Sequence, residues 1–236
     1  MSLNAYRTGI RRGLPVGLGY FSVSFGFGAM AAAQGIKAMD AALMSLVNFT
    51  SAGQFAGVTL IVACASLWEL VLTMVVINSR YALMGVALSQ RMGKNVGFLP
   101  RLLIAHMNSD EIFAIAMAER QPLTTPFMLG LGSLPILGWV SGTLLGSLAG
   151  SMLPLSVQTA MGVMLYGMFV AIVIPPARKE RPVLVAVAAA VVLSCLFTWV
   201  PGLKEVSGGI AIVICTVAAA ALCAVLFPIS DEEVAE

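Results

Sequence analysis

The stretch N48-F-T-S-A-G-Q-F55 lies inside an apolar run, Met39 to Ser66, whose 28 residues exceed what a bilayer crossing needs. As one helix the run would measure roughly 42 Å, against a hydrocarbon core of roughly 30 Å. The stretch also brings amides, hydroxyls and a glycine to a depth where lipid offers no water. It therefore predicts a helix that breaks inside a membrane, with a second half-helix beginning near Ala52.

The residues at the predicted break match a helix-capping motif. Ser51-Ala52-Gly53-Gln54 matches the S-x-x-Q capping box, in which the serine accepts an amide hydrogen and the glutamine reaches back. A helix N-terminus at this depth carries roughly half a positive charge and suits a carboxylate. The alternative is a continuous tilted helix whose Gln54 bonds to a neighbouring helix. The first interpretation makes Thr50, Ser51, Gly53 and Gln54 candidate substrate-binding residues.

The composition places the whole chain in a membrane. Of its 236 residues, 59% are hydrophobic and 10% are charged, whereas soluble domains carry about 25% charged residues. Because apolar windows fill nearly the whole length, we expect a single transmembrane domain over residues 1–236. Segments of spanning length lie at 14–35, 39–66, 67–90, 125–150, 156–176, 182–200 and 207–228.

An eighth segment, 98–118, is apolar but contains several polar and charged residues, among them Arg101, His106, Asn108, Asp110 and Glu111. It can span a bilayer only if this polar face is shielded from lipid. The predicted fold class is therefore an all-α integral membrane protein, a polytopic bundle of seven or eight transmembrane helices with a broken second helix.

Basic residues at the segment ends predict the orientation. Arg7, Arg11 and Arg12 favour a cytoplasmic N-terminus on a retained first helix, because the apolar stretch that follows is too long for a signal peptide. Six crossings then bring the basic 178–181 cluster to the cytoplasm as well, but they place the basic 91–101 loop outside. Either that loop is an exception or one of the early segments is re-entrant.

Glycine and proline suggest how the helices pack and whether the chain repeats. Leu14-Pro15-Val16-Gly17 and Leu134-Pro135-Ile136-Leu137-Gly138 open two glycine-rich segments about 120 residues apart, which is compatible with an internal repeat or with chance. In the later of these two segments, 125–150, glycine recurs at every fourth position, so another helix can approach closely there. These glycines are Gly138, Gly142, Gly146 and Gly150.

The third segment places Asn78-Ser79-Arg80-Tyr81 near its middle. An arginine at bilayer depth costs at least about 2.5 kcal/mol, so Arg80 must face a partner, water or substrate. Asp110 or Glu111 is its natural partner. Asn78, Arg80 and Asp110 then either line a substrate pathway or form a structural pair that joins two helices.

His106 is the one histidine of the chain, and Asp110 follows it by four residues, which would place both on one helix face. Histidine and carboxylates inside a membrane are the usual elements of a proton relay. His106, Asp110 and Glu111 are therefore candidate proton-coupling residues. The alternative is that this segment ends at an interface, with its charges in water.

The motifs for other functions are missing from the sequence. It has no Walker loop, Gly-x-Ser-x-Gly elbow or His-Glu-x-x-His pattern, so we expect no enzyme and no catalytic residues. One histidine and no Cys-x-x-C pair predict no metal site and no cofactor. Scattered basic residues argue against nucleic-acid binding. Cys64, Cys195, Cys215 and Cys223 lie in apolar runs, as packing residues do.

Four short motifs give the chain a resemblance to a known family. They are Gly13-Leu-Pro-Val-Gly17, the F-x-x-A-x-Q-F spacing of Phe49 to Phe55, Asn78-x-Arg80, and Asp110-Glu111-x-Phe113. On them the chain resembles, over nearly its whole length, the AzlC family, the large subunits of bacterial branched-chain amino acid exporters. That family often reads Gly-Ser-Ala-Gln-Phe where this chain has Ser51 to Phe55, and often has histidine where Tyr81 stands.

The resemblance implies export of valine, leucine, isoleucine or methionine across the bacterial inner membrane, with a small AzlD-type membrane subunit as partner. It supports Gln54, Asn78, Arg80 and Asp110 as pathway residues. A zwitterionic amino acid needs a positive seat, a negative seat and an apolar pocket. The half-helix start with Arg80 suits the first and Asp110 the second, while surrounding Phe, Met and Leu residues suit the third.

The sequence thus predicts a secondary transporter that exports small apolar amino acids by alternating access within the lipid bilayer. Formation of a homo-oligomer is compatible with it. One competing interpretation is a membrane scaffold or regulatory subunit whose buried polar pairs only hold helices together. Another is a channel for small solutes, which would need a continuous polar lining and no conformational cycle.

Overall fold

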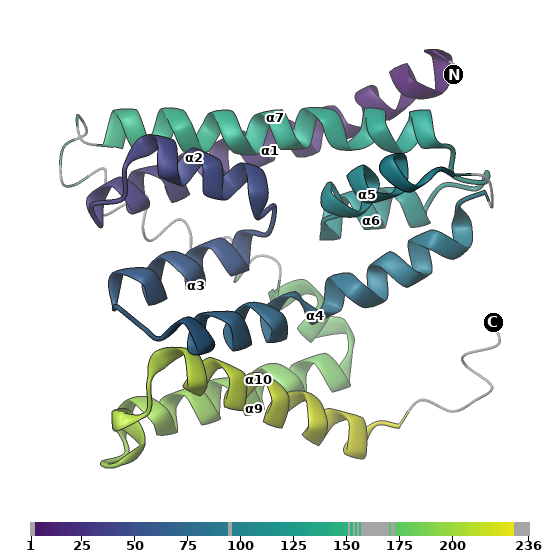
Figure 1. Cartoon of the computed structure of the whole chain (residues 1–236). Helices are drawn as coiled ribbons and strands as arrows, with labels where there is room; N and C mark the ends of the chain where they lie inside the picture. Colours follow the sequence, from purple (N-terminus) through teal and green to yellow (C-terminus); the bar gives the residue numbers. More distant parts are fainter. Residues whose placement is uncertain are drawn as a thin grey trace. The chain divides into compact units, whose positions relative to one another are not determined.

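The computed structural model describes residues 3–93, 96–150, 152, 154, 156, 170 and 173–228, and this part of the chain is built from helices (Figure 1). The helices are α1 (Leu3–Ala33), α2 (Ala38–Val47), α3 (Ser51–Val62), α4 (Leu67–Arg91), α5 (Phe98–His106), α6 (Asp110–Met117), α7 (Thr125–Gly150), α9 (Arg181–Trp199), the 3-10 helix η1 (Leu203–Glu205) and α10 (Gly208–Leu226). The all-helical class is confirmed for the described residues.

Among the described residues, five helices are long and apolar enough to cross a membrane: α1, α4, α7, α9 and α10. The predicted segments 67–90, 125–150, 182–200 and 207–228 agree with four of them to within two residues. The first begins earlier than predicted, at Leu3, because the helix continues through Pro15. Most of segment 156–176 lies outside the described residues.

The count of seven or eight crossings is not confirmed. The predicted second segment, 39–66, divides into α2 and α3, and the predicted eighth, 98–118, divides into α5 and α6. Each of these four helices is too short to cross a hydrocarbon core of roughly 30 Å at 1.5 Å per residue. The break in segment 39–66 was predicted from its excess length. The break in segment 98–118 was not predicted.

Contacts divide the chain into two compact units. Unit 1 consists of Met1–Phe55 and Asn78–Leu165, and unit 2 consists of Ala56–Ile77 and Tyr166–Glu236. Helices α3 and α4 each contribute residues to both units. The expectation of a single transporter domain stays a prediction.

In unit 1, α1 and α7 pack in parallel with their backbones in contact (Figure 1). A Cβ on Gly138 would stand 2.3 Å from the carbonyl oxygen of Gly17, and one on Gly146 would stand 2.0 Å from that of Phe25. Only hydrogen fits at such positions, so the ridge predicted from the spacing of four is confirmed as a close helix contact. The internal repeat is not confirmed.

Three residues mark one end of unit 1, called the basic end below: Arg12, Arg91 and Glu119. Arg12 Nη1 lies 2.6 Å from Glu119 Oε2. Arg91, the last residue of α4, donates to the carbonyl oxygens of Met117 at 3.0 Å and of Glu119. The N-terminal part of α1, the end of α4 and the end of α6 therefore meet here. Helix α5 follows α4 after a short loop, so α5 and α6 form a hairpin that starts and ends near the basic end.

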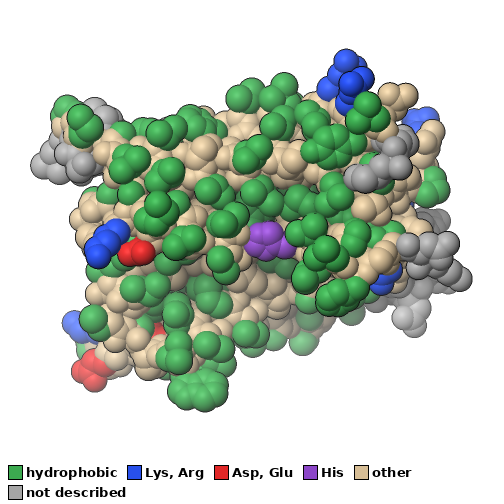
Figure 2. Space-filling model, turned by 45° about the horizontal axis from the view of Figure 1, so that its top comes forward, with side chains coloured by type: hydrophobic (Ala, Val, Ile, Leu, Met, Phe, Trp, Pro, Cys, Tyr) green, Lys and Arg blue, Asp and Glu red, His purple; other side chains and the backbone are tan. Residues whose placement is uncertain are grey.

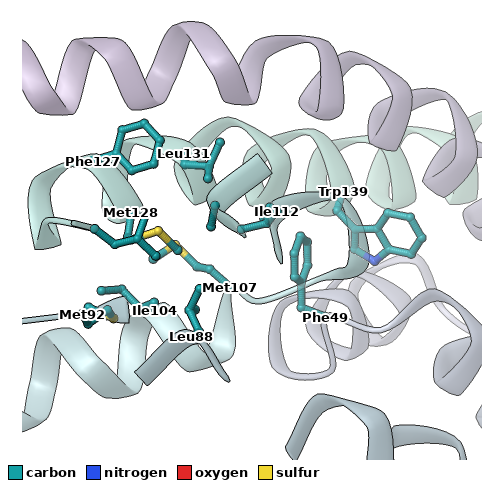
Figure 3. Packing of buried hydrophobic residues seen from close by; sticks show 12 residues of the cluster. Phe49, Leu88, Met92, Ile104, Met107, Ile112, Phe127, Met128, Leu131 and Trp139 are labelled. Carbon is teal, nitrogen blue, oxygen red and sulfur yellow. The ribbon is translucent and has the colours of Figure 1, made fainter. Parts of the chain in front are cut away.

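The apolar core of unit 1 lies between this hairpin and α7 (Figure 3). Ile104 and Met107 come from the first arm and its turn, Ile112 from the second arm, and Met128 and Leu131 from α7. Each of these side chains is buried. Burying such side chains contributes about 1.5–3 kcal/mol apiece, which holds the short helices in place without their spanning the membrane.

Large apolar side chains cover much of the molecular surface (Figure 2). Trp68 and Trp199 are each about three-quarters exposed. A surface of this kind is unfavourable in water and is expected against lipid.

Candidate functional site

The first break in the helices lies at Asn48–Thr50, where unit 1 contains the end of α2 and the start of α3. Asn48 ends α2 with a non-helical backbone, φ −114° and ψ 83°. The first backbone bond of α3 runs from Gln54 N to Thr50 O at 3.0 Å, so the N–H groups of residues 51–53 precede the helical ladder. A helix start near Ala52 was predicted, and α3 begins at Ser51.

Gln54 does not complete a capping box, so that part of the prediction is wrong. Its Oε1 accepts a hydrogen bond from Trp139 Nε1 at 2.6 Å, and its Nε2 donates to Ser45 Oγ at 2.8 Å. Because Gln54 is fully buried, its amide must find partners inside the protein, and α2 and α7 supply them. The alternative in which Gln54 bonds to neighbouring helices is correct for its side chain. Its role in substrate binding stays a prediction.

Three aromatic rings surround the break. Phe49 lies within the break itself, and its ring centroid is 5.7 Å from that of Tyr20 and 6.2 Å from that of Trp139 (Figure 3). Tyr20 and Trp139 are in turn 5.2 Å apart in an edge-to-face arrangement. Such pairs contribute about 0.5–1.5 kcal/mol beyond their buried area, so the break is a packed feature rather than a loose loop.

The second break lies between α5 and α6. Ser109 caps α6 by accepting a hydrogen bond from Ile112 N at 3.3 Å. Because α5 ends at His106 and α6 begins at Asp110, these two residues do not share a continuous helix face, and that premise of the proton relay is wrong. A spacing of four places residues together only when the helix is unbroken between them.

The two breaks meet through His106. Its Nε2 lies 2.9 Å from the carbonyl oxygen of Leu46, in the last turn of α2. A carbonyl oxygen only accepts, so this nitrogen carries the proton. Glu111, the third predicted proton-coupling residue, accepts a hydrogen bond from the hydroxyl of Tyr20 on α1. The turn of the α5–α6 hairpin is therefore tied both to α2 and to α1.

Arg80 pairs with Asp110, one of its two predicted partners. Arg80 Nη1 lies 2.9 Å from Asp110 Oδ2, and both side chains are 47% exposed. The guanidinium also lies over the ring of Tyr81, 5.1 Å from the centroid. A half-exposed pair in water contributes only about 0–1 kcal/mol, so little is lost when another charged group replaces one partner.

Two asparagines at the breaks have polar atoms with no hydrogen-bond partner among the described residues. Asn108, in the turn between α5 and α6, is 4% exposed, and neither its Oδ1 nor its Nδ2 is paired. Asn78 Oδ1 is buried and likewise unpaired. Leaving such a group unpaired costs about 1–3 kcal/mol, so these amides fit a polar ligand or water.

Gly53 sets the distance between the start of α3 and Asn78. A Cβ at Gly53 would lie 2.3 Å from Thr50 Oγ1 and 3.2 Å from Asn78 Nδ2. A side chain at position 53 would displace the Thr50 hydroxyl and crowd the Asn78 amide. The contact brings the predicted residues Thr50, Gly53 and Asn78 together.

The site is asymmetric in charge. Helix α3 has no acidic residue in its first turn, so its positive end is free to attract an anion. The first turn of α6 contains Asp110 and Glu111 instead and suits a cation. Sequence reasoning did not single out Asn108, because its polar type was visible but its burial without partners was not.

A separate cleft of about 410 Å³ lies in unit 2 between α9 and α10. Ser194, Thr198 and Thr216 supply its hydroxyls, and the rest of its lining is mainly apolar. No charged side chain lines this cleft. It therefore offers nothing to pair with the charges of a zwitterion.

Comparisons with known proteins support the membrane location that the apolar helices indicate. Residues 15–153, more than half of the chain, match the AzlC protein family. The chain is similar to the inner membrane protein YgaZ of Escherichia coli, with 27% identity over 78% of each chain. No solved structure matches it.

Two further relatives are described only as membrane proteins. One, from Archaeoglobus fulgidus, is 30% identical over 79% of this chain and 82% of its own. The other, from Helicobacter pylori, is 32% identical over 63% of this chain and 66% of its own. With five membrane-capable helices among its described residues, this chain is a membrane protein of a family linked to transport, and it belongs to the AzlC family.

Proposed function

We propose that this protein is a secondary transporter that exports branched-chain and other small apolar amino acids, such as valine, leucine, isoleucine or methionine, by alternating access. One observation carries the proposal: the Arg80–Asp110 pair lies where two interrupted helices meet. Interrupted helices that present backbone ends beside charged groups are typical of substrate sites in secondary transporters.

The proposed site binds both charges of an amino acid. The carboxylate lies at the start of α3, near Thr50, Ser51 and Gly53, and contacts Arg80. The ammonium group contacts Asp110. The positive end of α3 and the acidic first turn of α6 support this orientation, because each favours a charge of the opposite sign. Phe49 and Met107, both part of the core cluster, offer apolar contacts for the side chain.

Substrate binding then exchanges one ion pair for two. In the empty protein Arg80 and Asp110 satisfy each other at 2.9 Å. A bound zwitterion inserts between them, so that neither charge is left unpaired at any stage. This exchange provides two arrangements of the α5–α6 hairpin relative to α4, as alternating access requires.

Proton coupling through His106, Asp110 and Glu111 remains part of the proposal. The contacts of His106 with Leu46 and of Glu111 with Tyr20 link these groups to α2 and α1. A change of protonation at either group would alter a contact that holds the hairpin.

The proposed setting is the bacterial inner membrane, with the N-terminus and the basic end of unit 1 in the cytoplasm. A small AzlD-type membrane subunit is the proposed partner, and a homo-oligomer is compatible with the proposal. The 47% exposure of Arg80 and Asp110 supports a covering subunit or a water-filled path, since neither charge is stable against lipid.

Counterflow of labelled leucine in proteoliposomes, with and without the small subunit, tests the proposal. We expect saturable exchange that Arg80→Gln and Asp110→Asn each abolish. Arg12→Gln, which removes an arginine paired to a carboxylate at the basic end, is the matched control and should retain exchange. Absence of exchange under both conditions would favour a scaffold, and non-saturable flux without counterflow would favour a channel.

A further inference from the structure

The first turns of α1 present a basic surface that the proposed substrate site does not use. Arg7 and Arg11 are exposed, and because they are four residues apart they share one face of the helix. Gly9 and Gly13 form the face packed on α7, since a Cβ on Gly9 would stand 2.2 Å and one on Gly13 2.3 Å from a carbonyl oxygen of that helix. Residues two apart in a helix lie about 200° apart around its axis, so the two arginines lie on the side turned away from α7.

No carboxylate of the described residues balances these two arginines. Helix α1 contains no Asp or Glu. Glu119, the acidic residue of the basic end, is already paired with Arg12 at 2.6 Å. Arg7, Arg11 and the exposed Arg120 form no ion pair within the described part of the chain. These three guanidinium groups are therefore free to bind an external anion.

The same face of α1 continues as an apolar stripe. Leu14 and Leu18 follow Arg11 by three and seven residues, which places them on the face of the two arginines. Their side chains are 48% and 64% exposed. A surface with cations at one end and exposed leucines along the next two turns matches a phospholipid, in which a charged headgroup is joined to apolar chains.

The length of α1 sets the depth of the arginines in a bilayer. Its 31 residues measure roughly 46 Å, so the helix exceeds a hydrocarbon core of roughly 30 Å. With Ala33 at one face of the core, about 20 residues fill it, and the other face lies near Gly13. Arg11 then lies about 3 Å and Arg7 about 9 Å beyond that face. The headgroup layer is roughly 5–7 Å thick on each side, so both long side chains reach the level of the lipid phosphates.

The opposite end of α1 lacks this excess of positive charge. Lys37 follows α1 after a short turn, and Asp40, in the first turn of α2, carries the opposite charge. The asymmetry agrees with the proposed cytoplasmic N-terminus, because anionic lipids of the cytoplasmic leaflet attract basic residues beside a membrane helix. An anionic partner is therefore favoured at the basic end and not at the other end of the helix.

We propose that Arg7 and Arg11 bind the headgroup phosphate of an anionic phospholipid whose acyl chains lie against Leu14 and Leu18. A guanidinium group can donate two parallel hydrogen bonds to one phosphate, and two arginines one turn apart can share it. Arg120 adds to the positive potential at this end. The lipid then covers a face of α1 that α7 leaves open. This binding does not depend on the proposed transport function.

Native mass spectrometry of the purified protein in a neutral detergent tests the site, with phosphatidylglycerol as the probe. The natural protein should bind this lipid more tightly than phosphatidylcholine with the same chains, because the choline headgroup has no net charge. Arg7→Gln combined with Arg11→Gln should weaken binding of phosphatidylglycerol about 30-fold, or about fivefold for each arginine removed. Lys37→Gln, which removes a cation at the opposite end of α1, is the matched control and should bind as the natural protein does.

Two results would overturn the proposal. One is equal binding of phosphatidylglycerol by the natural protein and by the double glutamine variant. The other is equal binding of phosphatidylglycerol and phosphatidylcholine by the natural protein. Displacement of the lipid by inorganic phosphate at the same concentration would show a site for free anions and contradict the assignment to a lipid. Arg7→Lys combined with Arg11→Lys keeps both charges and should retain most of the binding.

Thermal unfolding in detergent gives a second readout and checks the fold of each variant. Phosphatidylglycerol should raise the unfolding temperature of the natural protein. The double glutamine variant should start from the same temperature in phosphatidylcholine, because Arg7 and Arg11 form no ion pair with a described residue, and it should gain nothing from phosphatidylglycerol. A rise of the same size in both proteins would contradict the site.

Discussion

At the residue scale, one amide joins three helices. Gln54 of α3 accepts from Trp139 of α7 and donates to Ser45 of α2, and all three side chains are buried. Ser45 is also bonded to Thr143 at 2.7 Å, so the network continues along α7. Such a network is stable only while every member is paired.

Gln54→Leu is expected to destabilise the protein by about 1–3 kcal/mol, because it leaves the Trp139 N–H and the Ser45 hydroxyl buried without that partner. Trp139→Phe removes the donor of the hydrogen bond between Trp139 Nε1 and Gln54 Oε1. Thermal unfolding in detergent of both variants and of the double variant gives the coupling energy, expected at about 0.5–3 kcal/mol. Strictly additive effects would show that the bond contributes nothing.

Asn108→Leu is expected to have opposite effects on stability and activity. The variant removes two unpaired buried polar atoms, so the empty protein should be as stable as before or more stable by about 1–3 kcal/mol. Leucine counterflow should fall, because the bound amino acid loses a polar contact. Unfolding and counterflow measured on the same preparation check both parts, and unchanged counterflow would remove Asn108 from the site.

At the element scale, the half-helices decide the topology. Arg12 and Arg91 both contact residue 119, so α4 ends at the same end of unit 1 as the N-terminal part of α1. This agrees with the interpretation in which an early segment is re-entrant, because full crossings would have placed Arg91 on the side opposite the N-terminus. With both arginines at one end, a cytoplasmic N-terminus would satisfy the positive-inside tendency for each of them.

Cysteine labelling from either side of the membrane tests this topology. In a background without the four native cysteines, Thr8→Cys and Gly97→Cys should react from the same side, and Gly35→Cys, just after α1, from the other. Labelling of positions 8 and 97 from opposite sides would contradict the hairpin assignment of α5 and α6.

Gly146→Ala is expected to separate α1 from α7. The new Cβ would stand 2.0 Å from the carbonyl oxygen of Phe25, so we expect destabilisation of about 1–3 kcal/mol, as for overpacked cores. Gly26→Ala is the matched control, because a Cβ there meets nothing within 4 Å. It should leave stability unchanged or raise it slightly, since alanine favours a helix. Unfolding temperatures in detergent distinguish the two.

At the scale of the whole molecule, the sequence predicted the features that follow from the lipid environment and from the length of each apolar segment. Lipid cannot accept a lone charge, so Arg80 required a partner, and Asp110 is that partner. The 39–66 stretch was too long for one crossing, and it is broken. The bonds of Gln54 and the burial of Asn108 could not be predicted, because they depend on residues distant in sequence. The relation of His106 to Asp110 was predicted wrongly because it assumed a continuous helix.

The glycine ridge between α1 and α7 has a consequence for motion. On α7 the close contacts repeat every four residues, at Gly138, Gly142, Gly146 and Gly150. A slide of α7 by one turn that brought Leu134 to the place of Gly138 would press a leucine side chain against the carbonyl oxygen of Gly17, so the ridge opposes that slide. Two side chains also hold the register: Ser147 donates to the carbonyl oxygen of Gly28 at 3.0 Å, and Ser24 donates to that of Gly138 at 3.3 Å.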